Sequence, residues 1–208
     1  MNWSKNILIF AMIGILSIGF QYSFAVPTIE MSTSKPVYEY GDLLSITFHV
    51  SELTGKQITF YIIDSSGKTS KPINWPIDNL NSTITAPVPF DKTRFQPGTY
   101  HITAEYSGVN ATTSFDLVDS GRIAIPFEIK IALQTWQQGT PTDKEYEQII
   151  QDIIHSGVIN IPDYNNQTSV HIPKWFNNNL VLWSKDSITD NELGIAIQYL
   201  VQKGIMVV

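Results

Sequence analysis

The chain has 208 residues, 43% of them hydrophobic, which is enough for one or two small domains with a buried core. Only 15% are charged, the net charge is −6 and Lys and Arg form no cluster, which argues against binding to nucleic acid. No cysteine is present, which excludes disulfides, thiolate catalysis and metal centres held by cysteine. A chain poor in charge but rich in Ser, Thr and Asn is typical of extracellular β structure.

Residues 1–25 have the order of a secretory signal peptide. Lys5 supplies a positive charge, residues 7–20 are an almost unbroken apolar run, and Ser23 and Ala25 place small residues at the cleavage positions. We predict cleavage after Ala25. An uncleaved membrane anchor is the competing interpretation, but the run is shorter than the ~20 residues needed to span a bilayer. We expect an extracellular or envelope-associated protein with no transmembrane span after cleavage.

Residues 26–120 predict an antiparallel β-sandwich. Apolar and polar residues alternate with period two in residues 44–50 and 99–106, and residues 57–63 and 112–118 predict further strands. Turn residues separate these segments. About seven short strands with a turn signal roughly every ten residues indicate a sandwich.

Two segments of this region resemble immunoglobulin-like or macroglobulin-type extracellular domains. They are Lys35-Pro36-Val37-Tyr38-Glu39-Tyr40-Gly41-Asp42, before a strand, and Phe95-Gln96-Pro97-Gly98-Thr99-Tyr100, at the expected closing hairpin. The resemblance implies a domain that presents loops or edges to a partner, or that acts as a spacer. It implies no particular activity.

After a predicted linker at residues 121–124, residues 125–208 contain a duplication. Residues 125–160 align without a gap with residues 172–207, at a constant offset of 47 (172 minus 125). The matches include Ile125-Pro126 with Ile172-Pro173, Trp136 with Trp183, Thr142-Asp143 with Thr189-Asp190, Glu145 with Glu192, and Gly157 with Gly204.

Each copy predicts a helix, a short loop, a second helix and a stop. Apolar residues in each first helix share one helical face, each second helix opens with a T-x-x-E capping box, and each glycine stands where a left-handed cap belongs. One such hairpin is too small to bury a core alone. We therefore expect the two copies to pack as a small all-α domain.

The second copy resembles a short C-terminal module of exported proteins from ammonia-oxidising archaea. The residues that carry the resemblance are Ile172-Pro173, Trp175, Asn178-Asn179, Trp183-Ser184, Asp190, Tyr199-Leu200 and Gly204. The resemblance implies an envelope or extracellular setting, and it carries no particular activity over to this chain.

No recognisable catalytic, cofactor or metal site emerges. His49 and His101 lie on the polar faces of predicted strands without a second histidine nearby, so solvated side chains are the better interpretation than metal ligands. Two aromatic residues are candidates for contact with a partner or a glycan: Trp75, in a predicted loop or edge, and Trp175, which is off the apolar helical stripe. Trp136 and Trp183 are predicted to be core residues.

Three N-x-S/T sequons, at Asn81, Asn110 and Asn166, lie in predicted turns or linkers and are candidates for glycosylation; chance occurrence in an Asn- and Thr-rich chain is the alternative.

The sequence thus predicts a mainly β protein with α: an N-terminal antiparallel Ig-like β-sandwich followed by a small all-α domain of two helical hairpins. We expect an exported cell-envelope interaction or structural protein without catalysis or cofactors. Its sandwich would present a surface to a protein or envelope component, and its helical repeat would dock to the envelope or to another protein. The alternatives are a carbohydrate-binding module and an accessory subunit of an exported enzyme complex.

Overall fold

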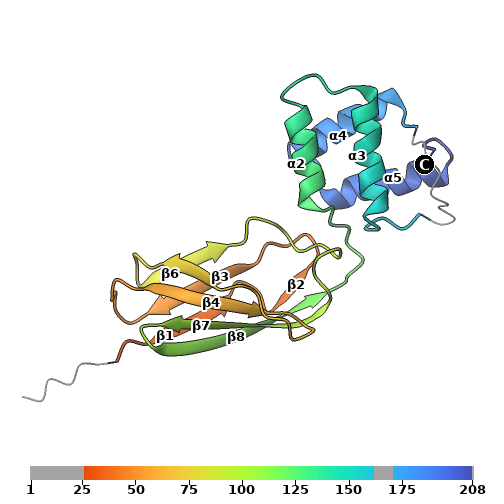
Figure 1. Ribbon diagram of the computed structural model, residues 1–208. Helices are drawn as coiled ribbons and strands as arrows, with labels where there is room; N and C mark the ends of the chain where they lie inside the picture. The colour runs from red at the N-terminus through yellow and green to blue at the C-terminus, as the bar shows by residue number, and fades with distance from the viewer. Residues whose placement is uncertain (1–25, 162–170, 208) are drawn as a thin grey trace, which may run out of the picture.

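The computed structural model describes residues 26–161 and 171–207. The predicted signal segment with its cleavage site at Ala25, and the sequon at Asn166, lie outside the described residues. Within them the chain is mixed α and β, mostly β, with two sheets followed by four α-helices. The sheets and the helices form two separate bodies joined by a short segment of chain (Figure 1).

The two sheets differ in width. The narrower sheet has the order β1-β3-β6, and its strands are β1 (Ile29–Thr33), β3 (Ser45–Val50) and β6 (Asn81–Thr85). The wider sheet has the order β2-β8-β7-β4-β5, and its strands are β2 (Val37–Glu39), β8 (Val109–Val118), β7 (Gly98–Tyr106), β4 (Gln57–Ile63) and β5 (Ile73–Pro76).

The sheets pack face to face as a sandwich around one core. The predicted alternation is confirmed in β3, where Ile46, Phe48 and Val50 are buried and His49 is exposed. Across the core, the ring centroids of Phe48 and Phe60 are 5.4 Å apart. Period-two alternation therefore selects the buried side of β3, and likewise of β7.

One strand pair departs from the predicted antiparallel arrangement. β2 pairs with β8 in parallel, with Tyr38 opposite Leu117. The chain leaves β1 at Thr33 and enters β2 at Val37, so it changes sheets within a few residues. It then runs beside β8 in the same direction as β8. This non-local pairing has no signature in the local sequence.

The helices are α2 (Phe127–Trp136), α3 (Asp143–His155), α4 (Asn177–Ser184) and α5 (Asp190–Gln202). Both capping boxes form. The side chains of Thr142 and Thr189 each accept a hydrogen bond from the amide of the glutamate three residues further on, and the side chain of that glutamate accepts one from the threonine amide. Gly157 and Gly204 have φ values of 71° and 65°, as the predicted left-handed caps require. The second copy differs in that a 3-10 turn, η1 (Lys174–Phe176), precedes its first helix.

Equivalent positions of the two aligned copies contact one another reciprocally. Lys130 lies 3.4 Å from Asp190, and Asn177 donates to Asp143 at 3.3 Å; residues 130 and 177, like residues 143 and 190, differ by the offset of 47. Ser184 donates to the Gln137 side chain at 2.8 Å, and these two positions are also equivalent. Such exchanged contacts are those expected of two units related by an approximate twofold axis.

The end of the connecting segment is buried, because residues 123–125 are buried whereas Gly121 and Arg122 are exposed. Ile123 and Ile125 belong to the helical core, whereas Ala124, between them, belongs to the sandwich core. The Ile123 amide donates to the Asn191 side chain at 3.1 Å, and the Ile125 amide donates to Asp190 at 2.9 Å. Residues 123–125, where the predicted linker meets the helical repeat, therefore tie both bodies together through alternate side chains and backbone amides.

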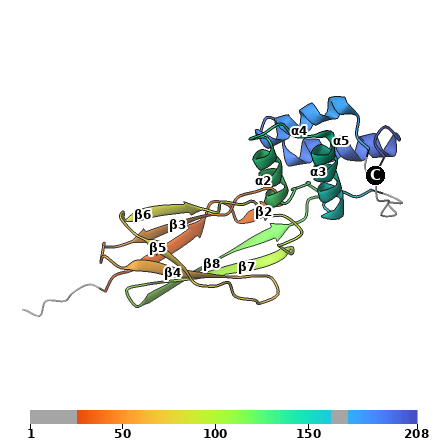
Figure 2. The ribbon, with the colours of Figure 1, turned by 45° about the horizontal axis from the view of Figure 1, so that its top comes forward.

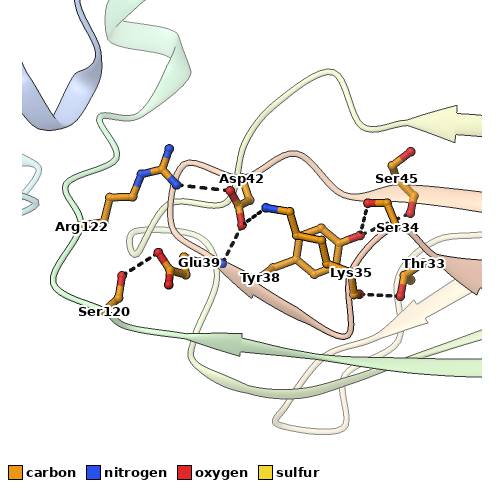
Figure 3. A network of polar contacts seen from close by, with 9 residues as sticks. All are labelled: Thr33, Ser34, Lys35, Tyr38, Glu39, Asp42, Ser45, Ser120 and Arg122. Carbon is orange, nitrogen blue, oxygen red and sulfur yellow. Dashed lines mark hydrogen bonds and ion pairs between the residues drawn. The ribbon is translucent and has the colours of Figure 1, made fainter.

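Asp42 fixes the sandwich side of this junction (Figure 3). Its carboxylate accepts from Lys35 at 2.9 Å, from the Glu39 amide at 3.0 Å and from Arg122 at 3.2 Å. Burial of this carboxyl group would raise the pKa of Asp42, but the hydrogen bonds from Lys35 and Glu39 and the charges of Lys35 and Arg122 outweigh it. They hold that pKa below its ordinary value of 3.8.

Candidate functional site

The difference in sheet width leaves part of the sandwich interior uncovered. In the wider sheet β5 is an edge strand, and its register places Ile73 opposite Phe60 and Trp75 opposite Ile58. Directly opposite residues point to the same face of a sheet, so Ile73 and Trp75 share the inward face with Phe60 and Ile58. Phe60 and Ile58 are 3% and 0% exposed, but Ile73 and Trp75 are 37% and 38% exposed. The inward face of β5 thus extends beyond the narrower sheet.

An apolar recess of about 340 Å³ lies at this overhang, between β5 and β6. We call it the edge groove; it is formed chiefly by Phe60, Ile62, Ile73, Trp75, Thr83 and Ile84. None of the residues that line it carries an ionisable side chain. Figure 2 shows the edge strands β5 and β6 that border it. A recess of this kind recognises apolar, uncharged groups.

The second rim of the edge groove is the free edge of β6. The amide of Val50 bonds to the Leu80 carbonyl, and the amide of Ala86 bonds to the Leu44 carbonyl. In an antiparallel pair the backbone groups of alternate residues face the neighbouring strand, so Ser82 and Ile84 bond to β3. The amides and carbonyls of Asn81, Thr83 and Thr85 face away from β3, and no described strand pairs with them.

The recesses at the junction between the two bodies have a different character. One, of about 470 Å³, is bordered by Arg122, Lys130, Asp186 and Asp190. These charged groups already have partners, because Lys130 lies 2.9 Å from Asp186 and Arg122 bonds to Asp42. The junction recess therefore presents charges that are used in holding the structure together.

Both aromatic candidates from the sequence are exposed, in different parts of the fold. Trp75 lies on β5 in the edge groove, which agrees with the predicted edge position. Trp175 lies on η1 of the helical body, is 60% exposed and packs edge-on against Phe176. The two indoles belong to separate bodies and do not form one platform.

The two described sequons lie in strands, so the prediction of turn positions was wrong. Asn81 is the first residue of β6 and Asn110 the second residue of β8, and both are exposed. The Asn81 side chain is also 2.7 Å from the His49 ring, on the outer face of the narrower sheet.

Sequence reasoning missed Ile73, Thr83 and Ile84 as groove residues. The alternation in Asn81–Thr85 could have predicted a strand there, but not that its far edge is free. Among residues 26–161 and 171–207, no group of three or more His, Cys, Asp or Glu residues is placed to hold a metal ion. No helix in the same ranges is long and apolar enough to cross a membrane.

No protein-family model matches the chain, and no curated protein matches it. Among solved structures, the sulfur carrier protein SoxY from Chlorobium limicola f thiosulfatophilum is 10% identical, with 56% of this chain and 99% of that chain covered and a TM-score of 0.29. The PKD domain of an M14-like peptidase from Thermoplasmatales archaeon SCGC AB-540-F20 is 17% identical, with 44% and 92% covered and a TM-score of 0.26. The chitinase ChiW from Paenibacillus sp. str. FPU-7 is 13% identical, with 65% and 15% covered and a TM-score of 0.31. Scores of this size establish no shared function, so the proposal below rests on this chain's own residues.

Proposed function

We propose that the chain is an exported interaction protein of the cell envelope, without catalysis, whose Ig-like sandwich binds a partner through the edge groove. The observation that carries this proposal is the exposure of Ile73 and Trp75 on a face that elsewhere forms the core. Apolar side chains that are grouped in a recess and left open to solvent are characteristic of interaction sites.

The sheet order supports the Ig-like assignment within this proposal. In an immunoglobulin domain one sheet has the strands A, B, E and D, and the other contains C, F and G. The order β1-β3-β6 corresponds to A, B and E, and the order β8-β7-β4 corresponds to G, F and C. Among residues 26–161 and 171–207 no strand occupies the position of strand D beside β6, and this vacancy opens the edge groove.

The helical repeat is proposed to dock the protein to the envelope or to a second protein. Support comes from apolar side chains that its core does not use: Ile195 and Tyr199 are 53% and 55% exposed and lie one turn apart on α5. Trp175 is a further exposed apolar side chain of this body.

Co-sedimentation with isolated envelopes of the source organism tests the proposal. The protein used would be residues 26–208, which contain every described element, as wild type, Trp75→Ala and Tyr61→Ala. Tyr61 is the control because it lies on β4 next to inward-facing Phe60 and therefore on the outer face. We expect chemical cross-linking in the pelleted fraction to yield a partner adduct that Trp75→Ala reduces and Tyr61→Ala does not.

Absence of the protein from the envelope fraction, or an adduct that is insensitive to Trp75→Ala, would refute the proposal. If the adduct is a glycan and free sugar competes with it, the carbohydrate-binding alternative replaces the protein partner. Co-purification with an exported enzyme whose activity depends on the chain would instead support the accessory-subunit alternative.

A further inference from the structure

We propose that the free edge of β6 accepts an extended, uncharged polypeptide segment of a partner protein as the missing fourth strand of the β1-β3-β6 sheet. This inference rests on the proposed function, because it specifies how the edge groove would hold its partner. It defines the ligand as a strand with apolar side chains at alternate positions.

The backbone of β6 supplies the first part of the recognition. The amides and carbonyls of Asn81, Thr83 and Thr85 point toward the vacant position, in the spacing that an added strand requires. Such unpaired edges are usually blocked by charged residues, proline or a bulge. β6 has the sequence Asn-Ser-Thr-Ile-Thr and contains none of these blocking residues. The neighbouring edge strand β5, by contrast, ends in Pro76.

The edge groove supplies the second part. A strand added to β6 would direct every other side chain toward the overhanging inward face of β5, where Ile73 and Trp75 are exposed. Apolar side chains at those positions would cover Ile73 and Trp75. Because no ionisable group lines the groove, a charged side chain would lose its hydration there without gaining a partner. The site therefore selects alternating apolar residues.

The width of the sheets argues against a second copy of this chain as the occupant. The groove places Ile84 of β6 beside Phe60 of β4 and Trp75 of β5, so the wider sheet extends past β6 by the strand β5. If two copies paired β6 with β6, each overhanging β5 would enter the space that the other copy's wider sheet occupies. A single strand without a second sheet beneath it avoids this collision.

The test uses a synthetic peptide of about eight residues, in which valine alternates with threonine between terminal lysines. Hydrogen exchange would be followed by NMR on residues 26–208. We expect the amides of Asn81, Thr83 and Thr85 to become protected when the peptide binds. The amides of Ser82 and Ile84 already bond to β3 and serve as internal controls.

Two variants at one position separate backbone pairing from side-chain contact. Thr83→Val and Thr83→Pro both remove the hydroxyl that lies 2.9 Å from the Thr47 hydroxyl, but only proline removes the outward-facing amide. Proline is tolerated on strand edges whose amides face solvent. We expect Thr83→Val to bind the peptide and Thr83→Pro to lose about tenfold or more in affinity. A peptide that is N-methylated at alternate residues should fail to bind wild-type protein, which tests the pairing without any substitution.

The inference is overturned if the three outward amides gain no protection, or if the N-methylated peptide binds as well as its parent. If Trp75→Ala abolishes the envelope adduct while Thr83→Pro and Thr83→Val form it equally, the groove binds its partner without strand addition. In that case the proposed function stands and this inference fails. If neither Trp75→Ala nor Thr83→Pro changes the adduct, both fail.

Discussion

Substitution of Gly194 by alanine tests how the connecting segment packs on the helical body. Gly194 is buried in the interior of α5. A methyl group built at this glycine would lie 2.7 Å from Cδ1 and 2.8 Å from Cγ2 of Ile123, which is closer than carbon atoms approach without displacement. Ile123 is itself buried, so its side chain has little room to move. The equivalent residue of the first copy is Glu147, which shows that the glycine belongs to this contact and not to the repeat.

The expected sign is opposite to that of helix propensity. Alanine in place of glycine in a helix interior normally stabilises by about 1 kcal/mol, whereas overpacking a core costs about 1–3 kcal/mol. We expect Gly194→Ala to lower the free energy of unfolding by about 1 kcal/mol, and Tm by about 2–4 °C. Urea denaturation followed by tryptophan fluorescence measures this difference.

The same substitution in an Ile123→Ala background provides the control. In that background the contacting methyl groups are absent, so Gly194→Ala should show only the effect of helix propensity and raise the free energy of unfolding by about 1 kcal/mol. If Gly194→Ala stabilises both backgrounds equally, Ile123 does not pack on α5 and the description of the junction is wrong.

Three further predictions concern the junction, the repeat and the groove. Asp42→Asn should destabilise the protein at neutral pH. The pKa of Asp42 is lowered in the folded state, so the stabilisation by its carboxylate is present above the ordinary value of 3.8 and disappears as pH falls through the folded-state pKa. The unfolding free energies of wild type and Asp42→Asn should therefore converge in acid. Asp190→Ala should lower the free energy of unfolding, measured by urea denaturation, by about 2–4 kcal/mol, because the Trp183 indole donates to Asp190 at 2.7 Å and would be left unpaired in the core. The equivalent Asp143→Ala removes a largely exposed carboxylate and should cost under about 1 kcal/mol. Peptide binding to the edge groove should change little between low and high salt in a titration, since its lining has no charged group, and a steep salt dependence would place the binding site elsewhere.

Local patterns in the sequence predicted the elements whose causes are local. The alternation around Phe48 selects its buried face, and the Thr142 and Thr189 boxes start α3 and α5 where the sequence placed them. These features depend on residues within one turn or one strand. A single sequence can therefore reveal them.

The groove depends on non-local relations, which explains why the sequence predicted only part of it. Trp75 was predicted as an exposed aromatic near an edge, but its exposure arises because the facing sheet ends at β6, one strand short. Nothing near Thr83 in the sequence shows that its amide lacks a partner. The burial of Ile123 was missed for a similar reason, because its neighbours on α5 lie about seventy residues further along the chain.

Site-specific photo-cross-linking on β5 tests the central claim most directly. A photoreactive residue would be placed at Ile73 or at Asn74 and the protein irradiated with native envelopes. These neighbours lie on one strand but on opposite faces, since Asn74 pairs with outward-facing Thr59. We predict a discrete cross-linked protein from position 73 and none from position 74. Equal cross-linking at both positions, or cross-linking from position 74 alone, would contradict the assignment of the edge groove as the binding site.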